Sequence, residues 1–167
     1  MYRLMLLRHA KSSWDDPSLA DRDRPLAPRG YRAAERMADH LRSDVPHPDL
    51  VLCSPALRTR ETLDRMSNAF GDAEVVVDDE LYGAGDDELL ERLLAVDDRF
   101  ETVAMIGHNP GIHDLAIALA GSGAELDRME AKFPTGALAV LAFDGPWRDV
   151  SPGGGLLEAF VTPKDLG

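Results

Sequence analysis

Leu4-Met5-Leu6-Leu7-Arg8-His9 is the stretch of sequence that decides the fold. Four consecutive apolar residues end abruptly at two basic ones. A short continuous apolar run of this kind is typical of a strand that is covered on both faces, as in a parallel sheet. The segment therefore predicts a buried strand over residues 2–7, whose carboxyl end delivers Arg8 and His9 to one edge of a sheet.

Outward from this strand, short apolar runs alternate with longer segments of helical periodicity. Further strands are expected over 50–53, 74–77, 102–106, 137–143 and 156–161. Helices are expected over about 28–41, from Pro55 after a Ser54 cap, over 86–95 and over 110–120. This alternation predicts an α/β fold with three layers, α/β/α, around an open and mostly parallel sheet. The last two strands have no helix between them, so we expect an antiparallel edge.

Composition narrows the class of protein. The chain has 167 residues, of which 30 are acidic and 18 basic, so its formal net charge is −12. One domain spanning 1–167 is expected from this length, and the charge argues against partners such as nucleic acid or an anionic membrane. No apolar stretch nears the roughly 20 residues of a membrane span. The only cysteine, Cys53, allows no internal disulfide, which is typical of a cytoplasmic protein.

Basic side chains follow three of the predicted strands. Arg8 and His9 follow the first strand, Arg58 comes one helical turn after the second, and His108 follows the fourth. Open α/β sheets bind ligands beyond the carboxyl ends of their strands, so these side chains should converge there. Because guanidinium groups match phosphate oxygens geometrically, the pattern predicts a phosphate site.

The same segments resemble those of a known family. Leu6-Leu7-Arg8-His9-Ala10-Lys11-Ser12 is similar to the Arg-His-Gly signature of the histidine phosphatase superfamily, in an Arg-His-Ala form. The segments 51–62 and 103–110 resemble its Ser-x-x-x-Arg-x-x-x-Thr segment and its second-histidine strand end. Arg24-Pro25-Leu26, with Arg29-Gly30 after it, resembles the short phosphohistidine phosphatases of SixA type. The resemblance implies a single histidine phosphatase domain with a phosphoglycerate-mutase-like fold.

The resemblance also implies a mechanism. His9 would be the nucleophile of a two-step phosphoryl transfer, and Arg8, Arg58 and His108 would hold the phosphoryl oxygens. Lys11 and Arg24 would lie at the rim of the substrate site. The substrate would be a phosphorylated protein, and the phosphoryl group would be removed from a phosphohistidine residue. No metal or cofactor is expected, because the arginines already supply the positive charge that a metal would bring.

The general acid is less clearly marked in the sequence. The mutase-like branch of the family carries a glutamate where this chain has Gly83. Glu80 is the nearest candidate, and Asp86 and Asp87 are alternatives. A weak or missing acid favours a substrate whose leaving group needs no proton from the enzyme, such as phosphohistidine or an activated ester.

Other functions remain open from the sequence alone. The same arginines would serve a phosphate-binding or phosphopeptide-binding module without turnover, although His9 is not needed for binding alone. A phosphomonoesterase acting on a small molecule is a further alternative, and a mutase would need the missing acid. The physiological substrate and the oligomeric state have no signature in the sequence.

Overall fold

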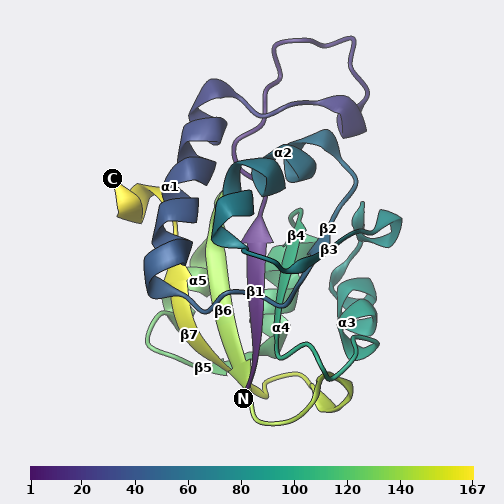
Figure 1. The fold of residues 1–167 in the computed structure, drawn as a ribbon, viewed down its shortest axis with the longest axis vertical. Helices are drawn as coiled ribbons and strands as arrows, with labels where there is room; N and C mark the ends of the chain where they lie inside the picture. The colour runs from purple at the N-terminus through teal and green to yellow at the C-terminus, as the bar shows by residue number, and fades with distance from the viewer.

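A single seven-stranded sheet runs through the middle of the computed structural model, which describes residues 1–167 (Figure 1). Its strand order is β3-β2-β4-β1-β6-β7-β5. The strands are β1 (Tyr2–Arg8), β2 (Leu50–Cys53), β3 (Glu74–Val77), β4 (Thr102–Gly107), β5 (Ala120–Ser122), β6 (Leu138–Phe143) and β7 (Gly155–Val161). β1 lies at the centre, with β4 parallel to it on one side and β6 antiparallel on the other. The prediction of a buried strand at this position is confirmed, since Leu4 to Leu7 are at most 2% exposed.

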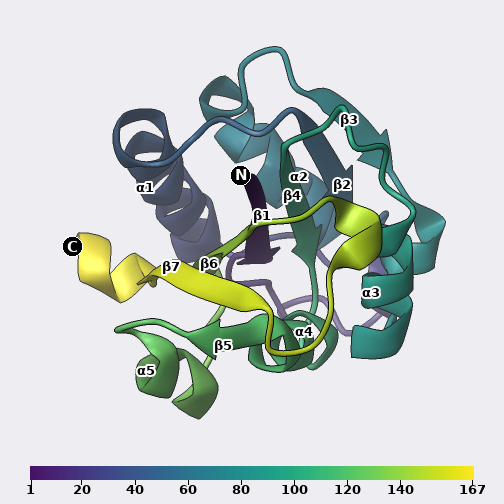
Figure 2. The ribbon, with the colours of Figure 1, turned by 90° about the horizontal axis from the view of Figure 1, so that it is seen from below.

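Helices cover both faces of this sheet (Figure 2). α1 (Pro28–Asp44) and α2 (Leu57–Met66) lie on one face, and α3 (Asp86–Leu94), α4 (Gly111–Leu119) and α5 (Leu126–Ala131) lie on the other. Successive side chains of a strand point to opposite faces. Accordingly Leu4 and Leu6 join the apolar core under α3 and α4, while Met5 and Leu7 join the core under α1 and α2. The three-layer α/β/α arrangement is confirmed. No helix has the length and apolar character needed to cross a membrane.

The end of the sheet beyond β6 has one strand more than the sequence predicts. β6 and β7 pair with each other in antiparallel fashion, as expected. The outermost strand, however, is β5, which pairs in parallel with β7. The sequence analysis missed β5 and α5, because a three-residue strand around Gly121 carries no periodic pattern. A Cβ at Gly121 would lie 2.1 Å from the carbonyl oxygen of Gly153, so this glycine permits a close backbone approach.

A long loop between β1 and α1, residues 9–27, rises beyond the carboxyl end of β1 (Figure 1). Backbone hydrogen bonds close its base: Ser13 N donates to Pro25 O at 2.8 Å, and Ala27 N donates to Lys11 O at 2.9 Å. The far part of the loop forms a short 3-10 helix, η1 (Asp21–Asp23). This closure brings η1 next to α2, with which it is in contact.

Candidate active site

His9 stands at the carboxyl end of β1 and is held by the backbone on two sides. Its amide donates to Gly107 O at 3.0 Å, and the amide of Gly136 donates to His9 O at 2.9 Å. The ring Nδ1 lies 2.7 Å from the carbonyl oxygen of Ala10. Because a carbonyl only accepts, Nδ1 carries the proton, and the neutral ring keeps its lone pair on Nε2. The ring is therefore fixed with its free lone pair on Nε2, and His9 is only 7% exposed.

His108 follows β4, and its ring centroid lies 5.3 Å from that of His9. Its Nε2 lies 2.7 Å from Ser54 Oγ. The Ser54 oxygen accepts a long bond from the amide of Ala56 at 3.4 Å, so its hydroxyl proton is free to donate to His108 Nε2. The proton of the neutral ring then lies on Nδ1, which is buried and has no partner within the protein. Ser54 does not begin a helix as expected, because α2 begins at Leu57.

Two arginines, the buried Arg58 and the half-buried Arg8, complete the cluster. Arg8 donates from Nη1 to the carbonyl oxygen of Phe133 at 3.0 Å. Arg58 donates from Nη1 and Nη2 to the backbone oxygen and the carboxylate of Asp21, at 2.7 and 3.0 Å. The Nε of each arginine is buried and has no partner within the protein. Buried donors are almost always paired, so these two point to an anion that binds here.

The electrostatics keep both histidines neutral. Burial lowers the pKa of His9 to about 3, and the charges of His108, Arg58 and Arg8 act in the same direction. Burial and the charge of Arg58 lower the pKa of His108 to about 4. Protonation of a buried ring beside two cations is unfavourable. At neutral pH the cluster therefore offers two neutral imidazoles and two permanent cations.

Asp21 connects the loop to this cluster. Besides Arg58, its carboxylate accepts a hydrogen bond from Tyr82 Oη at 2.5 Å and from Arg24 Nε at 3.3 Å. These bonds, that of Tyr82 first, lower the pKa of Asp21 to about 2. Tyr82 in turn packs edge-on against the ring of His108, with centroids 5.6 Å apart. Asp21 therefore orients Arg58 as an ionised group.

Arg24 lies at the rim but is firmly held. Its Nη1 donates to Ser12 Oγ at 2.9 Å and to Ser13 O at 3.1 Å. Its guanidinium stacks on the ring of Trp14, 3.5 Å from the centroid, and Trp14 is 70% exposed. The structure thus brings Arg24 to the cluster through Asp21.

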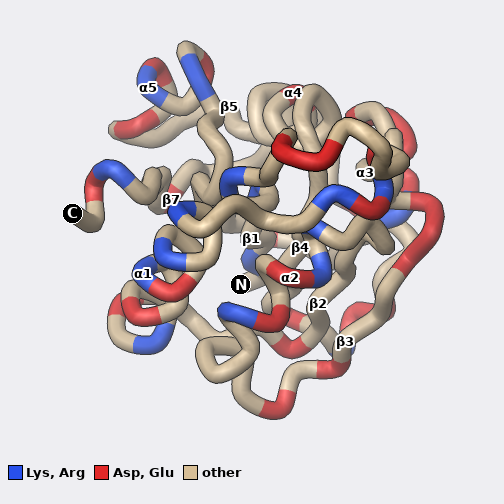
Figure 3. The backbone as a smooth tube through the Cα atoms, turned by 90° about the horizontal axis from the view of Figure 1, so that it is seen from above, with Lys and Arg blue, Asp and Glu red and all other residues tan.

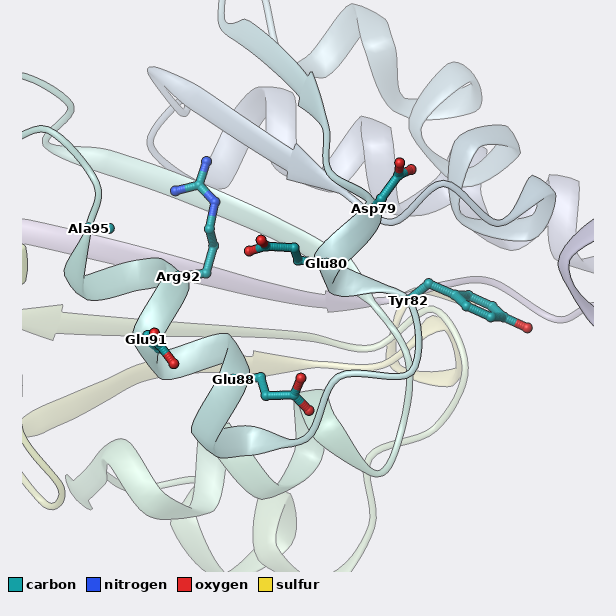
Figure 4. A pocket seen from close by; sticks show the side chains of 7 residues that line it. All are labelled: Asp79, Glu80, Tyr82, Glu88, Glu91, Arg92 and Ala95. Atoms are coloured by element: carbon teal, nitrogen blue, oxygen red, sulfur yellow. The ribbon is translucent and has the colours of Figure 1, made fainter.

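The structure does not bring Glu80 to the histidines. Glu80 is exposed and lines a cavity of about 520 Å³ between η3 (Asp79–Leu81) and α3. Figure 4 shows its carboxylate pointing toward Arg92, whereas Tyr82 points the opposite way. Asp86 and Asp87 lie in the first turn of α3, the former half-buried and the latter exposed. No carboxylic acid forms a hydrogen bond with His9 or His108.

Two other candidate polar side chains are not part of the cluster. Lys11 lines a separate pocket with Arg29 and Arg36. Cys53 is buried in β2, and burial raises the pKa of its thiol to about 12, so it is no thiolate nucleophile. No group of three or more His, Cys, Asp or Glu side chains is placed to hold a metal ion.

Sequence reasoning missed two residues of the site, Asp21 and Tyr82, and gave Ser54 the wrong partner. Asp21 and Tyr82 belong to loops without periodic pattern, and each reaches the cluster through a contact between distant parts of the chain. Ser54 carried a signal, because it directly follows β2 at the edge where the other site residues gather.

Comparison with known proteins identifies the family of this chain. Residues 4–89 match the family model of the histidine phosphatase superfamily, branch 1. An uncharacterized protein of Mycobacterium tuberculosis is 41% identical over 95% of this chain and 100% of its own length. A solved protein of Nakamurella multipartitia, assigned as a phosphohistidine phosphatase SixA, is 35% identical with a TM-score of 0.84, over 97% of this chain and 96% of that one.

A further solved structure is the protein histidine phosphatase SixA in complex with tungstate. It is 25% identical, with a TM-score of 0.80, and the match covers 99% of both chains. Arg8-His9 and the segment through Arg58 fall inside the residues that the family model matches. With its α/β fold, the chain therefore belongs to the histidine phosphatase superfamily, in the SixA-type branch, and is an enzyme of that family.

Proposed function

We propose that this protein is a phosphohistidine phosphatase that removes the phosphoryl group from a histidine of another protein. One observation carries the proposal: two neutral histidines and two arginines are gathered at the site without a carboxylic acid that could donate a proton. Asp21 is the carboxylate whose charge acts on His108, and its pKa of about 2 keeps it ionised. An alkoxide leaving group requires a proton donor, whereas the imidazole of a phosphohistidine carries its own proton.

In the first step, Nε2 of His9 attacks phosphorus while the bond to the substrate imidazole breaks. The leaving imidazole departs neutral, because it was protonated before the bond broke. The carbonyl oxygen of Ala10 accepts a hydrogen bond from Nδ1–H of His9, which stabilises the positive charge of the phosphorylated ring. Nε of Arg8, Nε of Arg58 and Nδ1 of His108 supply three donors for the phosphoryl oxygens. Such preorganised donors stabilise the charge of the transferring group.

In the second step, water attacks phosphorus and the bond to His9 breaks. His9 regains its lone pair, and phosphate and a proton are released. Neither step requires a metal ion, a cofactor or the Glu80 carboxylate. A reducing, cytoplasmic location and a phosphorylated protein as partner belong to this proposal. The SixA relative was solved in complex with tungstate, a phosphate-like oxyanion, which supports an oxyanion ligand for this chain.

The test is a substrate panel combined with a trap. Phosphohistidine, phosphoserine and sugar phosphates are compared at equal concentration, and labelled substrate is quenched to look for an acid-labile, base-stable phosphate on His9. We expect preference for phosphohistidine and loss of both turnover and labelling in His9→Ala. Equal turnover of phosphoserine or a sugar phosphate would indicate a small-molecule phosphomonoesterase. Binding without turnover would indicate a phosphate-binding module.

A further inference from the structure

A second basic pocket lies beside the catalytic cluster. It has a volume of about 180 Å³ and is lined by Lys11, Arg29, Ala33, Arg36, Thr135 and Pro163. Its lining contains three cations and no acidic residue, although acidic residues outnumber basic ones 30 to 18 in the chain. Acidic residues gather instead along β3 and α3 (Figure 3).

The three cations of this pocket have no ionic partner in the protein. None of them takes part in an ion pair, in contrast to Arg24 and Arg58 at the neighbouring rim, which both contact Asp21. Arg29 and Arg36 lie seven positions apart and therefore share one face of α1.

The carboxylates of α1 that could neutralise these arginines are engaged elsewhere. Glu35 pairs with Arg65, Asp39 pairs with Arg42, and Asp44 contacts His40. The positive charge of the pocket is therefore available to a ligand.

The pocket has a fixed position relative to His9. Lys11 follows His9 by two residues, so their Cα atoms lie within about 7 Å of each other. The carbonyl oxygen of Lys11 is fixed against the start of α1, where a Cβ at Gly30 would lie 2.1 Å from it. Thr135, which also lines the pocket, precedes Gly136, whose amide donates to His9 O. Two lining residues thus lie within two positions of His9 or of a direct backbone partner of His9, which puts the pocket within reach of a substrate that extends beyond its phosphoryl group.

We propose that Lys11, Arg29 and Arg36 form a second anion site, which binds a carboxylate or a phosphate of the same substrate whose phosphoryl group lies at His9. The inference rests on the proposed function in one respect: the phosphoryl site at His9 sets the distance at which the second anion is found. The chemistry is that of an oxyanion bound by two guanidinium groups and an ammonium group. The site selects substrates that carry a second negative charge close to the phosphoryl group.

The experiment measures equilibrium binding to His9→Ala, which binds without turnover. Two ligand pairs are used: phosphopeptides of one sequence with Glu or Ala beside the phosphorylated residue, and phenyl phosphate against 4-carboxyphenyl phosphate. Each ligand pair is measured with three proteins. The first carries His9→Ala alone, the second adds Arg29→Gln and Arg36→Gln, and the third, the control, adds Arg32→Gln and Arg148→Gln instead. The control removes the same charge from two exposed arginines outside the pocket.

We expect the doubly anionic member of at least one pair to bind about tenfold tighter, as for two exposed charge pairs. This preference should vanish in the Arg29/Arg36 variant, persist in the control and decline with added salt. A preference for the Glu peptide over the Ala peptide identifies a protein carboxylate as the second anion. A preference for 4-carboxyphenyl phosphate over phenyl phosphate identifies the second anion of a small molecule.

Equal affinities within both pairs would overturn the inference, as would an equal loss of preference in the control variant. Folding of each variant is verified by circular dichroism and thermal unfolding. Because binding is measured without turnover, a binding preference together with an inactive wild-type enzyme would overturn the proposed function and leave the second anion site standing.

Discussion

Replacement of Ser54 by alanine tests the geometry of the active site most directly. Ser54 is fully buried, and its hydroxyl lies 2.7 Å from Nε2 of His108. Ser54→Ala leaves this buried nitrogen without a partner and frees the ring to place its proton on Nε2 instead of Nδ1. The ring then presents a lone pair, rather than a donor, to the phosphoryl group.

The magnitude follows from the cost of an unsatisfied buried polar group, about 1–3 kcal/mol. When this cost falls on the transition state, where Nδ1–H faces the developing charge of the phosphoryl group, kcat falls by roughly 5- to 150-fold. The assay is turnover of an aryl phosphate, together with ¹⁵N chemical shifts of His108, which report the tautomer. We expect a reduced kcat and a loss of the Nδ1-protonated form.

Thr59→Val provides the matched control. Thr59 is equally buried, and its hydroxyl shares its proton between the backbone oxygens of Ser54 and Ala56, at 2.8 and 2.7 Å, and forms no hydrogen bond with His108. The two variants should lose similar stability, but only Ser54→Ala should lose turnover. Equal kcat values in both variants, or an unchanged His108 tautomer in Ser54→Ala, would refute the reasoning.

Four further predictions follow from the same geometry. Arg58→Lys should lower turnover less than Arg58→Ala, because lysine keeps the charge but loses the planar fork of the guanidinium group. The alanine variant should lose about 2–4 kcal/mol of transition-state stabilisation. Unchanged kinetics in both variants would exclude Arg58 from the site. The free energy of unfolding, measured with urea at pH values from 7 down to 4, should decrease as the pH is lowered. The pKa values of His9 and His108 are lowered in the folded protein, so below about pH 6.5 the unfolded chain binds more protons than the folded one. The slope should approach about 1.4 kcal/mol per pH unit for each histidine, and a flat profile would contradict the burial of both rings. Full activity should survive exhaustive chelation, since the arginines supply the positive charge; loss of activity that a divalent ion restores would disprove this. Glu80→Gln should change turnover of phosphohistidine and of aryl phosphates by less than about twofold, because Glu80 points away from the histidines; a selective loss on ester substrates would restore Glu80 as the general acid.

Local patterns determined the scaffold and the core of the site. The apolar run before Arg8 predicts a buried strand because burial on both faces requires continuous apolar character. His9, Arg58 and His108 are placed by the ends of β1, β2 and β4, and parallel neighbouring strands bring their carboxyl ends to one edge. These positions follow from register alone, so the chemistry-bearing residues could be identified without a structure.

Only the tertiary structure decided which groups surround them. Asp21 reaches Arg58 across 37 positions of the chain because loop 9–27 closes on itself, and no periodic pattern encodes that closure. Glu80 lies in η3, shortly after β3 ends at Val77, yet it turns toward α3, while Tyr82, two residues later, reaches Asp21. Side-chain direction in a loop depends on the packing of distant elements, whereas direction in a strand follows from the alternation of its residues. The positions of His9 and its neighbouring cations are thus determined by local sequence, and the absence of a carboxylic acid beside them by the tertiary fold.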